Sequence, residues 1–266
     1  MYEWAIISFI DILGFRHLVE SSPPEVVSAA LDSLEEFTNA GKIPESDHLP
    51  RVYSFSDSII RVRSLLPYAQ KQHPIGLLFY ELLDLVRIQA LLSDSGNLIR
   101  GGVTLGQISI SSNRVFGPGF IEAYDIESKY ARYPRIIVSQ KALKELEDTD
   151  RPLSECSDRS YDKEYVRQNL RQADDGFWFV DYLTSIATEL DPPEAYVSFL
   201  IKHKKFIISA ELPETELQPE VVNYKWLANY HNQCIEELRK EWCSEYNVNR
   251  EELIIRPDEL PTWYSF

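Results

Sequence analysis

The sequence predicts an α/β or α+β domain with a helical addition at its C-terminal end. Apolar, β-branched stretches alternate with stretches that carry apolar residues at helical spacing, which is the pattern of a sheet covered by helices. Residues 3–13 (EWAIISFIDIL) form an almost continuous apolar run, typical of a central strand buried on both faces. The 266 residues suffice for one large domain, or for a catalytic domain of about 150 residues with an appendage.

The other elements follow from periodicity and from start and stop signals. Pro23 and Pro24 begin a helix that Gly41 ends. The segment 148–172 is polar and strand-poor and is expected to be a surface excursion. We expect strands over 51–63, 99–110, 111–120, 134–139 and 176–183, and helices over 74–93, 119–132, 140–147, 192–205 and 218–245.

Composition excludes several classes of function. The net charge of −15 argues against a nucleic-acid partner, because such proteins need basic patches to displace counterions from phosphates. No apolar run reaches the roughly 18 residues of a membrane span, and the N-terminus lacks a basic, cleavable leader, so we expect a cytoplasmic protein without a membrane partner. The cysteines and histidines are too scattered to predict a disulfide framework or an imidazole metal cluster.

Two aspartates stand in stretches that are otherwise strand-like. Asp11 closes the first apolar run and is followed by a turn at Gly14, and Asp57 lies at a turn within the strand-like segment 51–63. Paired side by side, two such strands would bring both carboxylates within reach of two metal ions and a phosphate. Taken singly, each aspartate is more simply explained as a turn residue that satisfies its own backbone.

Four segments in order resemble class III adenylate and guanylate cyclases over roughly residues 5–140. FIDILGF and SFSDSII resemble the two metal-binding motifs, and LIRGGVTLGQI resembles the following strand with its R-x-G-(I/V)-x-x-G pattern. GPGFIEAYDIESKYARYPRIIVS resembles the segment in which a Gly turn opens a helix. The resemblance implies an α+β, ferredoxin-like catalytic domain over 1–147, with a central, mostly antiparallel sheet flanked by helices. Residues 148–266 are then a helical C-terminal extension that packs on it.

The resemblance also implies site residues. By position, Asp11 and Asp57 bind two divalent ions per site, Mn²⁺ or Mg²⁺, and the carbonyl of Ile12 adds a ligand. Gly14 and Phe15 lie in the turn that cradles the β- and γ-phosphates.

Arg100 falls on the arginine that contacts the triphosphate, a role suited to a fixed guanidinium. Tyr53 takes the position where purine cyclases carry a Lys or Glu that reads the base, and it cannot reproduce either purine pattern. Arg114, at the second base-reading position, is a donor that favours the O4 carbonyl of uracil.

Two positions depart from the cyclase pattern. The Asn that orients ribose and the Arg that stabilises the transition state align with Ile121 and Asp125. Lys129 and Arg132 or Arg135 are possible replacements, although a solvated helix face is the default explanation of such charges. Lys202, Lys204 and Lys205 are candidates for the phosphate-binding lysine that the family supplies from a further strand.

Within the family, Tyr53 and the AYDIE and YPRIIVS segments resemble the uridylate and cytidylate cyclases of Pycsar anti-phage defence. This resemblance implies conversion of UTP into 3′,5′-cyclic UMP and pyrophosphate by a homodimer with composite sites, the product being read by a separate cyclic-nucleotide-gated effector. Three alternatives stay open: the same reaction on CTP or ATP, a catalytically inactive nucleotide-sensing module, and a generic α/β interaction domain.

Overall fold

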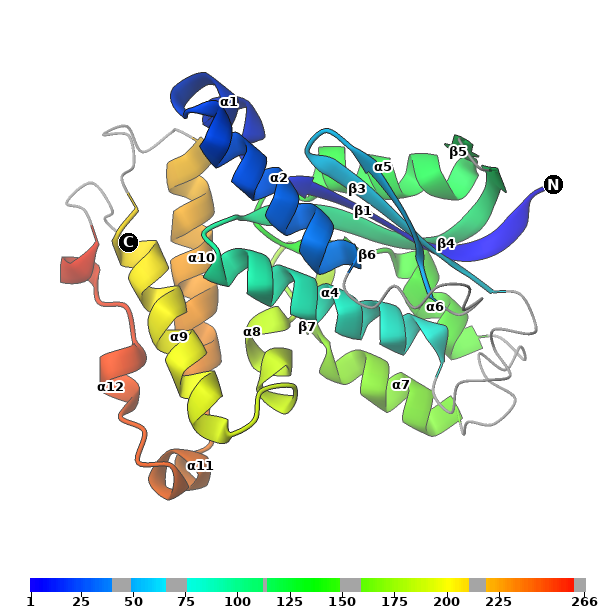
Figure 1. The fold of residues 1–266 in the computed structure, drawn as a ribbon. Helices are drawn as coiled ribbons and strands as arrows, with labels where there is room; N and C mark the ends of the chain where they lie inside the picture. Colours follow the sequence, from blue (N-terminus) through cyan, green and yellow to red (C-terminus); the bar gives the residue numbers. More distant parts are fainter. Residues whose placement is uncertain (40–48, 66–75, 112–113, 149–158, 211–218, 261–266) are drawn as a thin grey trace.

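The protein is built around one mixed sheet flanked by helices, as Figure 1 shows. A computed structural model describes residues 1–39, 49–65, 76–111, 114–148, 159–210 and 219–260. In these ranges eight strands pair in the order β2-β3-β1-β4-β6-β8-β7, with β5 paired to β4. The strands are β1 (Glu3–Ile12), β2 (Arg51–Phe55), β3 (Ser58–Ser64), β4 (Ile99–Ser111), β5 (Arg114–Phe116), β6 (Ile136–Val138), β7 (Leu170–Gln172) and β8 (Trp178–Val180). Only β4 and β6 run parallel, so the α+β prediction with a mostly antiparallel sheet is confirmed.

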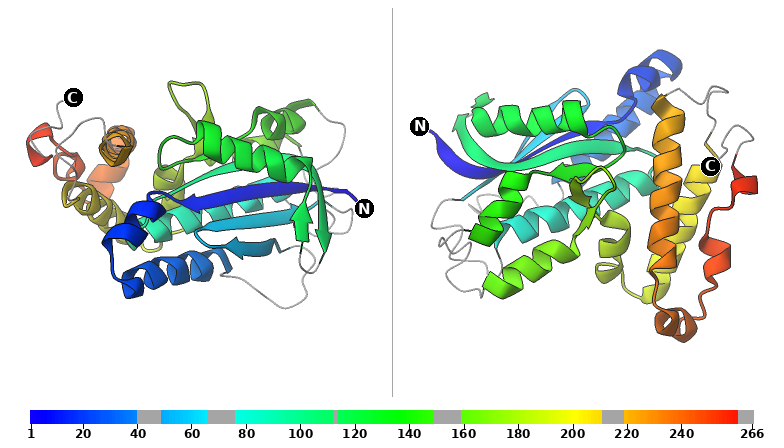
Figure 2. Two further views of the ribbon diagram at one scale, coloured as in Figure 1. Left: turned by 90° about the horizontal axis from the view of Figure 1, so that it is seen from above. Right: turned by 180° about the vertical axis from the view of Figure 1, so that it is seen from behind.

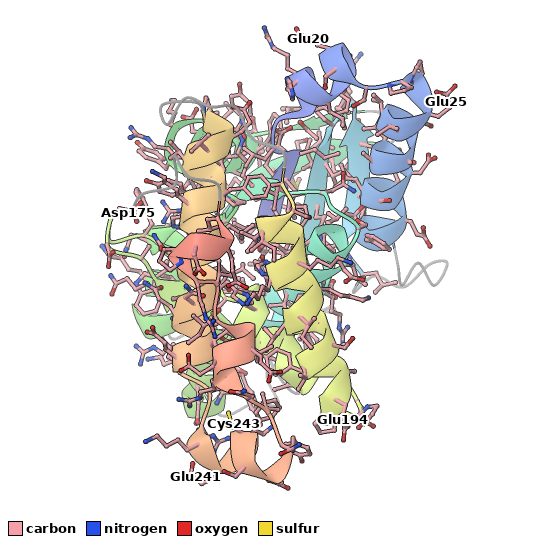
Figure 3. All side chains as sticks on the ribbon, turned by 90° about the vertical axis from the view of Figure 1, so that its left-hand side faces the viewer. Glu20, Glu25, Asp175, Glu194, Glu241 and Cys243 are labelled. Atoms are coloured by element: carbon pink, nitrogen blue, oxygen red, sulfur yellow. The ribbon has the colours of Figure 1, made fainter. Side chains whose placement is uncertain are left out.

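Helices cover both faces of this sheet. Helix α5 lies on one face, and α2 and α4 lie on the other, which is clearest when the molecule is viewed from above (Figure 2). Helices α9 and α10 stand side by side at one end of the sheet (Figures 1 and 3). The helices are α1 (Phe15–Ser21), α2 (Pro24–Asn39), α4 (Leu77–Asp94), α5 (Pro118–Tyr130), α6 (Gln140–Asp148), α7 (Arg159–Gln168), α8 (Tyr182–Ser185), α9 (Pro193–Ile208), α10 (Pro219–Glu236), α11 (Lys240–Glu245) and α12 (Arg250–Leu253). No described helix combines the length and apolarity of a membrane span.

Strand β1 is central and buried on both faces, as its apolar run predicts. Ile6 and Ile10 join the large core beneath α4, whereas Ile7 and Phe9 face α5. The Phe9 ring meets the ring of Tyr124 on α5 edge-on, with 5.4 Å between centroids. Because side chains alternate along a strand, Asp11 falls on the α5 face.

Three element predictions need correction. The strand-like segment 51–63 is a hairpin of β2 and β3, because its pattern breaks at the turn before Ser58. The segment 148–172 is not strand-poor throughout, since it contains α7 and β7, and β7 extends the central sheet through β8. The predicted helix 218–245 is two helices, α10 and α11. The boundary at residue 147 stays a prediction. Cys234 and Cys243 are free and buried, and Cys156 lies outside the described residues.

A buried charge network joins β3 to α4. Arg61 and Arg63, on β3, have side chains only 3% and 4% exposed, and both point at α4. Glu81 accepts from both Nε groups, at 2.9 and 3.1 Å, and from the Ser8 hydroxyl at 2.8 Å. Asp84 accepts from both Nη2 groups, at 2.6 and 2.7 Å. Four charges thus pair inside the fold, as buried charges must.

A second polar chain lies inside the C-terminal helices. The Nε2 of His231 lies 2.9 Å from the Leu253 carbonyl, and the Nδ1 atoms of His231 and His203 are 3.1 Å apart. The Tyr182 hydroxyl lies 2.8 Å from Nε2 of His203. Since a carbonyl only accepts, His231 donates from Nε2, His203 donates to His231, and Tyr182 donates to His203. With both rings neutral, these donor directions satisfy every link.

The two buried histidines predict that the protein loses stability in acid. Burial holds the pKa of His203 well below its usual range, helped by His231, and lowers that of His231 to about 4. The unfolded chain therefore binds more protons between pH 4 and 6.5, and stability falls as pH drops through this window, by up to about 1.4 kcal/mol per pH unit for each ring. Urea unfolding at pH 7.5, 6 and 5 measures how steeply the free energy of unfolding changes with pH. His231→Gln, which stays neutral and can both donate and accept, should flatten this dependence. An unchanged slope would contradict the assignment of neutral rings.

Candidate functional site

The end of β1 and the β2–β3 hairpin bring Asp11 and Asp57 to the same edge of the sheet. Asp11 pairs in register with Ser58 on one side, and the Ser58 hydroxyl donates to Oδ1 of Asp11 at 2.8 Å. Asp57 directly precedes Ser58 in the two-residue turn that closes the hairpin. Ser56, the other turn residue, has a φ of 54°, the positive value that a tight hairpin turn needs at its first position. The turn therefore holds the Asp57 backbone against the end of β1.

Backbone groups complete this edge. The Ile12 N–H donates to the Asp57 carbonyl at 3.1 Å, and its own carbonyl shares that edge, since both groups of a strand residue point the same way. Gly14 follows with a φ of 79°, a left-handed conformation that a side chain would strain, and it precedes α1, which starts at Phe15. A Cβ on Gly14 would meet no atom within 4 Å, so the space beside the turn is open.

Arg100 lies on the opposite side of Asp11. The two residues are paired in register across β1 and β4, and Nη2 of Arg100 is 3.5 Å from Oδ2 of Asp11. The Nε of Arg100 is 2.6 Å from Oε1 of Glu127 on α5, an ion pair in which the N–H does not point at the oxygen. Asp11, Asp57, Arg100 and Glu127 thus form one cluster of charges at the carboxyl end of β1.

Glu127 was missing from the sequence-predicted site. Its side chain is 4% exposed, although it is charged, because it belongs to the face of α5 that packs on the sheet. The buried members of that face are Gly119, Ala123, Ile126 and Glu127. Helical spacing from Ala123 places Glu127 on this face, but that spacing does not show that α5 sets the residue against Arg100.

Burial and like charge act strongly on the carboxylates. Burial raises the pKa of Asp11 to about 6, the Ser58 hydrogen bond opposes the shift, Asp57 adds to it, and Arg100 opposes it. Burial also raises the pKa of Glu127 to about 7, against the nearby charge of Arg100. Perturbed carboxylates that converge beside an arginine are typical of functional sites.

Glycines on β4 let α5 come this close. A Cβ on Gly102 would lie 2.4 Å from the Ala123 carbonyl oxygen and 2.7 Å from Cβ of Ile126. A Cβ on Gly106 would lie 2.5 Å from Cα of Gly119. Gly102 and Gly106 are the glycines of the R-x-G-(I/V)-x-x-G pattern. The pattern therefore allows α5 to pack closely on β4, which brings Glu127 next to Arg100.

Gly102→Ala should therefore displace α5. The added methyl meets a backbone carbonyl that cannot rotate away, and we expect a loss near the upper end for overpacking, about 3 kcal/mol, measured by urea unfolding. Gly176→Ala is the control, because its Cβ would meet no atom within 4 Å and only its φ of 83° is unfavourable, at about 1–2 kcal/mol. Equal losses in the two variants would contradict the close-packing explanation.

The two base-reading candidates lie away from this cluster. Tyr53, on β2, is half-buried and packs beside the residues that face α5, two strands from Asp11. Burial raises its pKa, with Arg51 opposing the shift and Glu3 adding to it. Arg114 is exposed on β5 and pairs with Ser111, roughly 35 Å of strand from Arg100. Within one chain, Arg114 and the carboxylates do not meet.

The candidate cations either have other partners or are exposed. Ile121 is exposed, and Asp125 pairs with Lys129 one turn away at 2.9 Å. Arg135 is ruled out: its side chain is 1% exposed, packs against aromatic rings such as Tyr133, and pairs with Asp175, which Figure 3 labels near α10. Arg132 and Lys205 are exposed, Lys202 pairs with Asp94, and Lys204 pairs with Glu259.

The cluster offers oxygen ligands suited to a hard divalent metal ion, but only two of them come from side chains. Among the described residues, no group of three or more His, Cys, Asp or Glu side chains is arranged to hold a metal. Asp11 and Asp57 offer carboxylate oxygens and Ile12 a carbonyl oxygen, ligands that Mg²⁺ and Mn²⁺ prefer and that Zn²⁺ sites use less. A divalent ion would also neutralise the like charges that raise the pKa of Asp11. These residues therefore fit such an ion.

Comparisons with known proteins give distant structural similarity only. No family model and no curated protein matches the chain. The fold is similar to the monomeric guanylyl cyclase domain of the RhoGC fusion protein from the aquatic fungus Blastocladiella emersonii, with 14% identity, a TM-score of 0.43, and coverage of 67% of this chain and 95% of that one. It is also similar to a bacterial light-regulated adenylyl cyclase, with 12% identity, a TM-score of 0.40, and coverage of 76% and 99%. At these scores we assign no function from them.

Proposed function

We propose that the protein is a class III-type nucleotidyl cyclase that converts UTP into 3′,5′-cyclic UMP and pyrophosphate. The observation that carries the proposal is the convergence of Asp11, Asp57 and Arg100, from β1, the β2–β3 turn and β4, at one edge of the sheet. These residues come from three separate motifs of the cyclase resemblance. A chance set of turn aspartates has no reason to meet an arginine from the third motif.

In this proposal Asp11, Asp57 and the Ile12 carbonyl hold two divalent ions. When bound, the ions lower the pKa of the ribose 3′-hydroxyl and neutralise charge on the triphosphate. Ser58 fixes the carboxylate of Asp11 through its hydrogen bond, and the Ser56–Asp57 turn fixes the second ligand. The open turn at Gly14 presents backbone N–H groups to the β- and γ-phosphates.

Arg100 binds the departing pyrophosphate. Its guanidinium is 31% exposed and lies beside Asp11, so it can reach an anion bound at the carboxylates. Because the in-line attack on the α-phosphorus needs little covalent help, alignment and charge neutralisation by fixed groups supply most of the rate.

The active unit in this proposal is a homodimer in which Tyr53 and Arg114 of one copy read the base held at the carboxylates of the other. The distance between Arg114 and Arg100 along β4 requires two copies if both contact one nucleotide. Large apolar side chains that a second copy could cover are exposed around α5 and the hairpins: Phe55, Phe116, Ile121, Tyr124 and Tyr130. Tyr53 favours a pyrimidine, and cyclic UMP would then serve as a second messenger in anti-phage defence, read by a separate effector.

A second candidate is a nucleotide-sensing module without catalysis. It is favoured by Ile121 and Asp125, which occupy the positions of the ribose-binding Asn and the transition-state Arg, and by the pairing of Lys129 with Asp125. Such a module would bind nucleoside triphosphate at the same cluster and return it unchanged.

Incubation of the purified protein with Mn²⁺ and ATP, GTP, CTP or UTP, followed by mass identification of cyclic products, separates these candidates. We expect cyclic UMP, and no product from Asp57→Ala. Cyclic CMP or cyclic AMP would overturn only the roles given to Tyr53 and Arg114. Binding of a triphosphate without any product would favour the sensing module.

A further inference from the structure

The guanidinium of Arg100 is held from one side only. Oε1 of Glu127 lies 2.6 Å from Nε of Arg100. Nη2 of Arg100 lies 3.5 Å from Oδ2 of Asp11, which is longer than a good charge-assisted hydrogen bond. For Nη1 the structure records no partner among the described residues. The side chain is 31% exposed and that of Glu127 only 4%. The buried end of the pair is thus fixed, and the Nη end faces the open side of the cluster.

The backbone around Glu127 is closely packed. Helix α5 packs so closely on β4 that Cβ atoms on Gly102 or Gly106 would collide with its backbone. Arg100 sits in the same strand, in register with Asp11. A carboxylate fixed on the helix can therefore set the direction of a long, flexible side chain on the strand, which is how an ion pair pre-organises a binding group.

The ionised Glu127 is costly to the fold. Burial raises its pKa to about 7 even with Arg100 beside it, so the charged form is less stable than a neutral side chain would be in the same place.

We propose that Glu127 is a positioning residue that holds Arg100 by its Nε edge, so that both Nη groups point at the phosphates bound beside Asp11. The proposal rests on the proposed function for the identity of the anion, a triphosphate. It predicts that the effect of Glu127 on phosphate binding passes entirely through Arg100.

A double-mutant cycle tests this dependence without requiring turnover. The affinity for inorganic tripolyphosphate in excess Mn²⁺ is measured by calorimetry for the unaltered protein, Glu127→Gln, Arg100→Ala and the double variant. We expect each single change to weaken binding roughly tenfold or more, because one change removes and the other misdirects the guanidinium that would donate charge-assisted hydrogen bonds to the phosphates. The double variant should bind no more weakly than Arg100→Ala alone.

Glu122→Gln is the matched control. Glu122 lies on the same helix and pairs with Lys141 at 3.1 Å without touching Arg100, so its replacement should leave the affinity unchanged. Circular dichroism and thermal melting check that each variant is folded. If Glu127→Gln binds normally, or weakens binding by the same factor with and without Arg100, Glu127 is a structural residue and the proposal is wrong. The same holds if the unaltered protein does not bind tripolyphosphate.

The outcomes also separate this inference from the proposed function. Coupling between Glu127 and Arg100 in a protein that forms no cyclic nucleotide would uphold the positioning role and overturn the cyclase reaction. A cyclic product without coupling between Glu127 and Arg100 would uphold the cyclase reaction and overturn the positioning role.

Discussion

Asp11→Asn is expected to lower cyclic nucleotide formation by about 10³-fold, the scale seen when a fixed charge-stabilising group is removed from an active site. The change keeps the shape of the side chain and its hydrogen bond from Ser58. It removes the negative charge that, together with that of Asp57, would bind the metal ions. Asp32→Asn, on the exposed face of α2, is the control and should retain full activity. Activity within tenfold of the unaltered protein would mean that Asp11 has no catalytic role.

The same variant should be no less stable. In EDTA the pKa of Asp11 is raised to about 6 by burial and by Asp57, so the folded state holds the proton more tightly than the unfolded chain does. The stabilising contribution of the protonated form is complete below pH 3.8 and is lost as pH rises through 6. At pH 8, Asp11→Asn should therefore melt at a higher temperature than the unaltered protein, and the difference should shrink toward pH 4. A lower melting temperature at pH 8 would contradict the destabilising burial of the Asp11 charge.

The sequence predicted the central part of the fold because its patterns there are local. The β-branched apolar run before Asp11 is typical of a strand buried on both faces, and β1 is one. The glycines after Arg100 predict a strand that a helix approaches closely, and α5 packs against β4 at these glycines. These segments also carry the cyclase resemblance, so the cluster of Asp11, Asp57 and Arg100 was foreseeable.

Contacts between distant segments were not foreseeable from periodicity. Glu127 is a charged residue on a helix, and a solvated face is the ordinary explanation for such a residue until the register of α5 on β4 is known. His203 and His231 lie 28 residues apart and meet only because α9 and α10 pack side by side. Arg61 and Arg63 alternate with apolar residues, a pattern that also describes an exposed strand face.

The carboxylate that pairs with both arginines, Glu81, is predicted to be important for stability. Glu81 is fully buried; burial alone would raise its pKa, but Arg61 and Arg63 hold the pKa below its usual range. Its removal leaves two buried guanidiniums with Asp84 as the carboxylate that both still contact. Uncompensated buried charge costs far more than a lost surface pair, because water cannot replace the missing partner.

Glu81→Ala should therefore lower the free energy of unfolding by about 3–5 kcal/mol, which approaches the whole stability of a marginal domain. Asp84→Ala should cost less, since that side chain is 32% exposed and water can reach the vacated position. Replacing Arg61, Arg63 and Glu81 together by leucines should recover much of the loss, because well-packed apolar groups need no partners. Urea unfolding of the three variants decides the matter. If Glu81→Ala stays within 1 kcal/mol of the unaltered protein while the triple variant unfolds, β3 and α4 are held by packing and the charges are incidental.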